Sequence, residues 1–199
     1  MIESLTPAEW ARLPLLYAHV IASMLAVARV LSADLGLVTG RLGRDALHGA
    51  VRDIARLLVA LWITGLAIVW LDTGFAPTEL AARPKLLLKL AVVSALTANG
   101  AVLHRASFPV LLSDRPPGPG ASLLLSTTGA LSTMHWLLAA FIGIAGPLDR
   151  VPLGELLRVY ALLFAATVGV SACCMPMVRR RVLGWRRSSD PALKLDIGL

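Results

Sequence analysis

The chain has 199 residues, of which 57% are hydrophobic and 16% are charged, and its mean hydropathy is +0.74. This composition excludes an ordinary soluble globular domain and indicates that the lipid bilayer is the main solvent. The formal net charge of +7 does not indicate a nucleic-acid-binding protein, because the basic residues are spread along the gaps between apolar runs and form no single basic face.

The apolar runs are continuous rather than alternating, which favours helices over a membrane β-barrel. We therefore predict an all-α integral membrane helix bundle with five transmembrane helices, each long enough for the roughly 20 residues that a bilayer core requires. The predicted spans are 13–38, 54–72, 85–106, 121–145 and 155–177. Around them we expect an interfacial N-terminal helix over 1–12, a transmembrane domain over 13–178 and a basic cytoplasmic tail over 179–199.

The N-terminal segment has the pattern of a helix start. Thr6 precedes Pro7, and Glu9 follows three residues after Thr6, which is typical of a capping box. Trp10 suits the headgroup region. The segment carries acidic residues and lacks a basic n-region, so we do not expect a cleaved signal peptide.

The distribution of Lys and Arg predicts the topology, since cytoplasmic loops carry an excess of them. The ends of the first, third and fifth spans are rich in these residues: Arg41, Arg44, Arg52, Arg56, Arg105, Arg115, Arg179, Arg180, Arg181, Arg186, Arg187 and Lys194. The opposite side has only Arg12, Arg83, Lys85, Lys89, Arg150 and Arg158. The sequence thus predicts a multi-pass protein of a bacterial inner membrane, with the N-terminus outside and the C-terminus cytoplasmic.

All four histidines lie in or near predicted spans, where ionisable residues are costly and indicate function. His19 and His135 fall in the outer half of the membrane, about 6 Å apart in depth, whereas His48 and His104 lie near the inner surface. Imidazoles from facing helices are typical axial ligands of haem b, and a transition metal uses the same groups. We predict His19 and His135 as the iron ligands, with His48 and His104 as a second pair. The alternative is that each histidine only hydrogen-bonds a neighbouring carbonyl or, near the surface, has no such role.

Three further ionisable residues fall within the predicted spans. Arg29 suits an anionic partner such as a haem propionate or a lipid phosphate. Lys89 either extends outward to the headgroups or has a buried partner. Asp34 is expected to accept a bond from His104 or to pair with a basic residue, and a proton relay is the less favoured interpretation.

The predicted fourth span is unusually polar. Thr128, Ser132 and His135 project to one side at helical spacing, which indicates a ligand site or a water-filled pocket. Ser122 and Ser126 lie on a different side, which favours close helix packing.

The end of the predicted fifth span combines soft sulfur ligands. Cys173 and Cys174 are followed by Met175, Pro176 and Met177, and such side chains suit Cu(I). The alternative is that these are ordinary membrane residues and that Pro176 ends the helix.

Several short motifs of the first three spans resemble a group of small, mostly uncharacterised bacterial polytopic membrane proteins. They are His19 in the first span, Thr64-Gly65-Leu66 in the second, Arg83-Pro84-Lys85 with Lys89 opening the third, and Asn99-Gly100 before His104. That group is distantly similar to the membrane protoporphyrinogen oxidase of haem synthesis and to the copper-resistance D-type proteins. The resemblance implies a haem-ligating histidine at His19 and a functional lysine at Lys89.

Three functional hypotheses follow. The first is an inner-membrane haem b protein for electron transfer or redox chemistry on a tetrapyrrole or quinone-like substrate, with a membrane redox partner. The second is a metal or small-solute permease in which Asp34, Thr128, Ser132 and His135 line a path. The third is a non-catalytic subunit of a larger membrane complex. A homo-oligomer is compatible with all three, and the sequence leaves open whether the protein is an enzyme.

Overall fold

The computed structural model describes residues 6–113 and 117–189, and within these residues every regular element is a helix. The elements are α1 (Pro7–Thr39), α2 (Arg44–Thr73), α3 (Pro77–Ala81), α4 (Pro84–Val102), the π-helix η1 (Leu103–Ser107), α5 (Phe108–Leu112), α6 (Pro119–Ile144), the 3-10 helix η2 (Gly146–Arg150) and α7 (Leu153–Ser189). Among the described residues, five segments are long and apolar enough to cross a membrane, the third being α4, η1 and α5 together. The prediction of an all-α bundle with five spans is confirmed.

Local chemistry sets the ends of the first two long helices. The predicted capping box is confirmed, because the Thr6 hydroxyl accepts from the Glu9 backbone N–H at 3.3 Å and the Glu9 carboxylate accepts from the Thr6 N–H at 2.7 Å. Gly40 and Gly74 end α1 and α2 in the left-handed conformation, with φ of 71° and 56°. The short connection that begins at Gly40 therefore folds α1 and α2 into an antiparallel pair, and the turn at Gly74 leads from α2 to α3.

The helices extend beyond the predicted spans. Residues 7–12 are the first turns of α1 and form no separate helix, and α2 begins at Arg44 instead of residue 54. The hydropathy pattern locates only the part of a helix that lies in hydrocarbon, whereas the backbone hydrogen bonds continue into the charged flanks. At 1.5 Å per residue α1 is roughly 50 Å long, well above the roughly 30 Å of a bilayer core.

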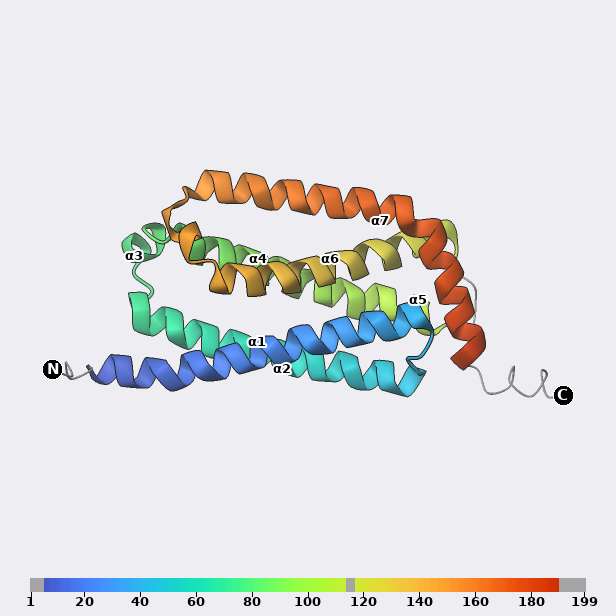
Figure 1. The fold of residues 1–199 in the computed structure, drawn as a ribbon, viewed down its shortest axis with the longest axis horizontal. Helices are drawn as coiled ribbons and strands as arrows, with labels where there is room; N and C mark the ends of the chain where they lie inside the picture. The colour runs from blue at the N-terminus through green and yellow to red at the C-terminus, as the bar shows by residue number, and fades with distance from the viewer. Residues whose placement is uncertain (1–5, 114–116, 190–199) are drawn as a thin grey trace.

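Pro176 does not end the last helix. It lies inside α7, which continues to Ser189 and turns sharply in its last third (Figure 1). A proline inside a helix removes one backbone hydrogen bond and commonly causes such a bend. Residues 190–199 of the predicted basic tail, together with Arg115, lie outside the described residues.

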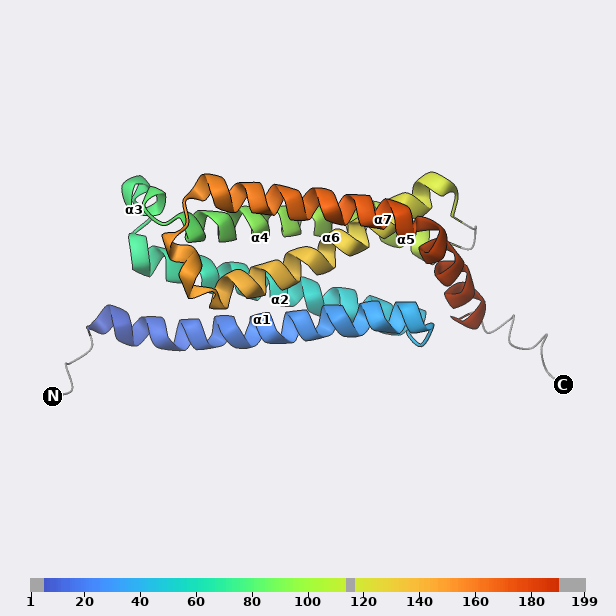
Figure 2. The same cartoon turned by 45° about the horizontal axis from the view of Figure 1, so that its top comes forward.

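The long helices run along one common axis. Figures 1 and 2 show the α1/α2 pair on one side of the bundle, α7 on the opposite side, and α4 and α6 between them. α1 begins at the end of the bundle that carries α3, and α7 finishes at the other end, beside α5 (Figure 1). We call these the α3 end and the α5 end. The start of α1 and the end of α7 therefore lie at opposite ends of the bundle, as an odd number of spans predicts. The assignment of the α3 end to the outside stays a prediction.

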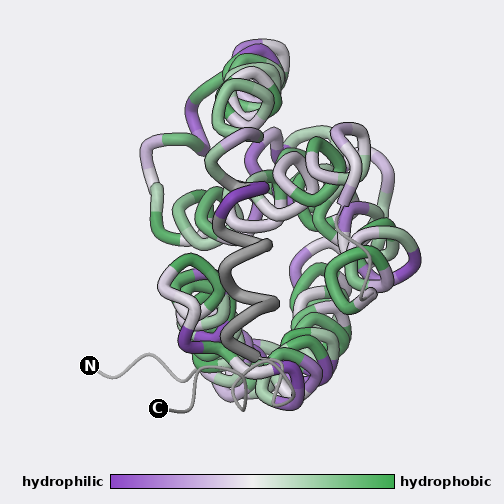
Figure 3. Tube along the Cα trace, turned by 90° about the vertical axis from the view of Figure 1, so that its right-hand side faces the viewer, coloured by the Kyte–Doolittle hydropathy of each residue, from purple (hydrophilic) through white to green (hydrophobic). Residues whose placement is uncertain are grey.

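The apolar core is small, as in a bundle that faces lipid. One cluster joins α1, α2, α4 and α6 through Ala22, Ala26, Val30, Leu61, Leu96 and Trp136. Many large apolar side chains are exposed instead, among them Ile63, Leu162 and Val170. The end-on view in Figure 3 shows hydrophobic segments around the perimeter of the bundle as well as inside it. Lipid contact therefore accounts for the outer surface.

Hydroxyl and amide groups connect α6 to its neighbours. The Ser126 hydroxyl donates to the Ser171 carbonyl of α7 at 2.8 Å, and Asn99 of α4 donates to the Thr128 carbonyl at 2.9 Å. Ser122 is also buried, so the predicted packing role of Ser122 and Ser126 is confirmed. Short polar side chains allow the close helix contacts that membrane bundles require.

Ala26 and Ala28 give a matched test of this packing. Ala26 is fully buried and Ala28 is exposed on the same helix. We expect Ala26→Leu to destabilise the protein by about 1–3 kcal/mol, since overpacking strains the core, and Ala28→Leu to leave the melting temperature unchanged. Thermal unfolding in detergent measures both, and equal melting temperatures for the two variants would contradict the orientation of α1.

Candidate functional site

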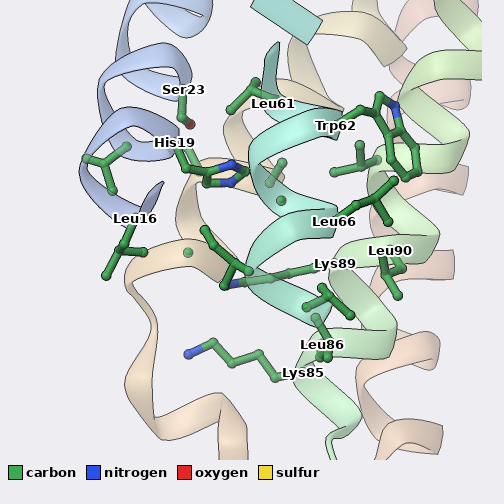
Figure 4. A pocket seen from close by; sticks show the side chains of 18 of the residues that line it. Leu16, His19, Ser23, Leu61, Trp62, Leu66, Lys85, Leu86, Lys89 and Leu90 are labelled. Atoms are coloured by element: carbon green, nitrogen blue, oxygen red, sulfur yellow. The ribbon is translucent and has the colours of Figure 1, made fainter. Parts of the chain in front are cut away.

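A pocket of about 630 Å³ opens between the α1/α2 pair and the α4/α6 pair near the α3 end of the bundle. Its lining combines apolar side chains with a group of charged residues, and Figure 4 shows His19 on α1, Leu61 and Trp62 on α2, and Lys85 and Lys89 on α4 around it. The volume falls within the roughly 300–1,000 Å³ of small-molecule and cofactor sites. This pocket is the candidate functional site.

Helical spacing explains why these residues share the pocket. On α1, Arg12, Leu16, His19 and Ser23 recur every three or four residues and so lie along one stripe. α2, α4 and α6 contribute similar stripes of mostly apolar residues. The stripes face one another, and the polar groups among them therefore converge on one volume.

The hydrogen bond between His19 and Thr64 favours one tautomer of the imidazole. Its Nδ1 lies 2.8 Å from Thr64 Oγ1, and the Thr64 hydroxyl itself donates to the Ala60 carbonyl at 2.7 Å. A hydroxyl has one hydrogen to donate, so when Thr64 donates to Ala60 it accepts from His19, and Nδ1 is then the protonated nitrogen. The lone pair of His19 Nε2 is then left for a ligand or a metal ion.

Gly65 permits the approach of His19 to α2. A Cβ built on Gly65 would lie 3.2 Å from His19 Cε1, closer than most side-chain contacts. The Thr64-Gly65 pair thus provides both the acceptor and the space that hold the imidazole against α2.

Ion pairs surround the mouth of the pocket. The Arg12 guanidinium donates to the Asp72 carboxylate at 2.8 Å and 3.4 Å, and Arg83 donates to the Asp72 carbonyl at 3.1 Å. Lys85 pairs with Asp149 of η2 at 3.2 Å. These contacts join the starts of α1 and α4 to the end of α2 and to η2, and so give the pocket a charged rim.

Lys89 differs from the other cations of the site. Among residues 6–113 and 117–189 it has no hydrogen-bond or ion-pair partner, and its side chain extends from α4 toward α1 on the same side as Lys85 (Figure 4). The lining carries four cationic residues, Arg12, Arg83, Lys85 and Lys89, against the carboxylates of Asp72 and Asp149. The pocket therefore has an excess of positive charge and favours an anionic group.

The structure does not bring His135 into the pocket. His135 is 1% exposed, its Nδ1 donates to the Leu131 carbonyl at 2.6 Å, and its Nε2 accepts from the Tyr160 hydroxyl at 2.8 Å. Tyr160 and Phe164 of α7 pack edge-on against its ring. Both nitrogens are used, so the predicted axial pair of His19 and His135 is not preformed. The neighbouring residue Trp136 lines the pocket instead.

The other side chains that were predicted to face a ligand are used within the bundle or lie at its surface. Thr128 bonds to Ser107 of η1 at 2.9 Å, so this side of α6 faces neighbouring helices and not a water-filled pocket. His48 is exposed with Nδ1 2.9 Å from the Arg44 carbonyl, and His104 is exposed with its ring edge-on to Phe108. These two histidines form no second ligand pair with each other in the described contacts.

Arg29 has a protein partner. Its guanidinium pairs with Asp53 of α2 at 2.7 Å, and both side chains are nearly half exposed. Asp53 thus takes the place of the haem propionate or lipid phosphate that was predicted as the partner of Arg29. The pair lies outside the pocket lining.

The sulfur-rich end of the fifth span forms no evident metal centre. Cys173 is exposed and Cys174 partly exposed, and the described residues contain no group of three or more His, Cys, Asp or Glu side chains placed to hold a metal ion. The copper hypothesis also counts Met175 and Met177 as ligands, and it stays a prediction.

Sequence reasoning found His19 and Lys89 but missed the rim. Arg12 and Asp72 are 60 residues apart, and Lys85 and Asp149 are 64 apart. A usable signal was present, because opposite charges stand at helix ends that the predicted topology places on the same side of the membrane.

Comparisons of the chain with protein-family models, with curated proteins and with solved structures give no match. The interpretation of the pocket therefore rests on its own geometry.

Tyr160 and Tyr17 test the assignment of His135 to helix packing. Tyr160→Phe removes the donor to His135 Nε2 and leaves a buried acceptor without a partner, so we expect a loss of about 1 kcal/mol in stability. Tyr17, which is 71% exposed, provides the control Tyr17→Phe with no expected loss. Unfolding of both variants in the same detergent measures the difference, and an unchanged stability for Tyr160→Phe would contradict the assignment.

Proposed function

We propose that this multi-pass membrane protein is a bacterial inner-membrane haem b protein that binds its cofactor in the pocket, where His19 would hold the iron. The observation that carries the proposal is the orientation of His19, whose Nδ1 lies 2.8 Å from Thr64 Oγ1, so that Nε2 is the nitrogen left for iron. Haem-ligating histidines commonly have their second nitrogen fixed in this way. When bound, haem b would supply one-electron chemistry at this site.

The walls and charges of the pocket support the same ligand class. Leu16, Leu61 and Leu90 provide apolar contact for a flat hydrophobic ring system, while Lys89 and the rim arginines provide cations for carboxylate groups. A ligand that is both apolar and dicarboxylate matches this combination better than a neutral quinone or a simple metal ion. We therefore assign Lys89 to the carboxylate side of the ligand.

The proposal uses one protein histidine. Because both nitrogens of His135 are engaged, a second axial bond from that residue would require loss of its bonds to Leu131 and Tyr160. His19 would therefore be the one protein residue that holds the iron, while His135 would keep its helix contacts. The resemblance of His19 and Lys89 to the haem-pathway oxidase group is consistent with this arrangement.

The permease hypothesis has less support. Its path required Thr128, Ser132, His135 and Asp34 to face a common channel, but Thr128 bonds to η1 and His135 bonds to α7. None of the four lines the pocket.

His19 provides the main test. The detergent-purified protein is expected to show a Soret band with about one haem per chain, and His19→Ala is expected to abolish it because the iron loses its only protein ligand. His135→Ala is the contrasting variant and is expected to retain the band. Absorption and magnetic circular dichroism spectra, measured on folded monodisperse samples, report haem content and spin state.

Two outcomes would overturn the assignment. One is the absence of haem both in the purified protein and after reconstitution with added haem. The other is a Soret band that is lost in His135→Ala but retained in His19→Ala.

Lys89 tests the carboxylate side of the site. Lys89→Met is expected to weaken haem affinity about tenfold, which corresponds to the loss of one charge-assisted hydrogen bond, and Lys89→Arg should restore most of it. Titration with haem dimethyl ester is the matched control, because the ester lacks the carboxylates and its affinity should be unaffected by Lys89→Met. If the variant weakens both ligands equally, the lysine does not recognise a carboxylate.

A further inference from the structure

Asp34 of α1 is a carboxyl group inside the bundle that has no basic partner among the described side chains. It is partly buried, and the Thr133 hydroxyl of α6 donates to its Oδ2 at 2.5 Å. The predicted bond from His104 is absent, and among the described residues Asp34 forms no ion pair. Asp34 lies five residues before the end of α1, roughly 8 Å from that end along the helix axis.

Among the described side chains, the elements packed against this part of α1 place no basic group within ion-pair distance of Asp34. α6 contains no Asp, Glu, Lys or Arg, and α7 contains none between Arg158 and Arg179. The last third of α7 carries the exposed Arg179 and Arg180, and the side chains of Arg181, Arg186 and Arg187 lie outside the described ones.

On α2, Asp53 is paired with Arg29, while Arg52, Arg56 and His48 are exposed. Arg44, at the start of α2, is partly exposed and forms no described ion pair with Asp34. His104 and Arg105 of η1 are also exposed.

An ionised carboxylate in such a place is costly. Transfer of a charge from water into a membrane bundle is repaid only by a paired charge or by several hydrogen bonds. In the part of the chain that the structure describes, Asp34 has one hydrogen-bond donor and no paired charge. The neutral, protonated form therefore competes effectively with the ionised form.

Thr133 is able to partner both protonation states. When Asp34 is ionised, the Thr133 hydroxyl donates to it. When Asp34 is protonated, its own hydroxyl donates to Thr133 Oγ1, and the Thr133 hydrogen turns to the Gly129 carbonyl, which lies 3.3 Å away. A rotation of one hydroxyl thus accompanies the gain or loss of a proton, and no backbone movement is needed.

We propose that Asp34 is a reversible proton-binding site at the contact of α1 with α6, with Thr133 as the switching hydrogen-bond partner. The site lies toward the α5 end of the bundle, away from the pocket near the α3 end. It is fifteen residues after His19, roughly 22 Å along α1, so it is independent of the proposed haem site.

Dicyclohexylcarbodiimide, an apolar reagent that labels protonated carboxyl groups in membranes, provides the test. The carboxyl oxygen adds to the central carbon of the reagent, the acid proton moves to a reagent nitrogen, and the product rearranges to a stable N-acylurea without loss of atoms. The full chain in lipid vesicles is treated between about pH 5 and pH 9 and mapped by peptide mass spectrometry. We expect an adduct at Asp34 whose yield falls severalfold as the pH rises, and none at the paired Asp53.

Two variants distinguish a carboxyl group that binds a proton reversibly from one that the reagent merely reaches. Asp34→Asn should lose the adduct, and Thr133→Val should keep labelling high to a higher pH because the ionised form loses its only donor. Infrared spectra provide a second measurement, in which a protonated-carboxyl C=O band should be present at low pH and absent in Asp34→Asn. Absence of both adduct and band, or an adduct yield that is the same across the pH range, would overturn the proposal.

Discussion

Polar groups inside the bilayer must find partners within the bundle, and this constraint places most of the polar side chains of the chain. Ser126 bonds to α7, Thr128 bonds to η1, and His135 joins α6 to α7 through Tyr160. The high content of hydroxyl groups in α6 is therefore explained mainly by helix contacts. Once these hydroxyl and imidazole groups are hydrogen-bonded, few polar side-chain atoms of the described residues lack a partner. The candidate sites are found where such atoms remain.

The pocket near the α3 end contains polar groups that have no hydrogen-bond partner among the described residues. Thr64 takes up one nitrogen of His19 and leaves the other, and the ion pairs of Asp72 and Asp149 leave Lys89 without a partner among the described residues. The pocket thus combines an apolar wall with one imidazole nitrogen, from His19, and one ammonium group, from Lys89, that is unpaired in the described part of the chain. This combination favours ligands that have a hydrophobic body, a metal ion or other group that binds an imidazole nitrogen, and an anionic substituent.

The sequence predicted the coarse fold because continuous apolar runs determine the number of spans. Helix ends were less predictable, since the charged flanks of α2 remain helical outside the apolar run. His19 and Lys89 were identified because ionisable residues at membrane depth are unusual. The fate of His135 was not predictable, because its partner Tyr160 lies 25 residues away on another helix and depends on how α6 and α7 rotate against each other. Residue spacing gives the direction of a side chain on its own helix but not the neighbour that it meets.

The two candidate sites on α1 are separated by an apolar barrier. Between His19 and Asp34, the buried face of α1 carries Ala22, Ala26 and Val30, which pack against Leu61, Leu96 and Trp136. Arg29 lies in the same interval but points outward to Asp53. This cluster contributes no polar side chain between the pocket and Asp34. Movement of α1 against α6 would change the contacts of both sites, and the Asp34–Thr133 bond is a polar contact that such movement would alter.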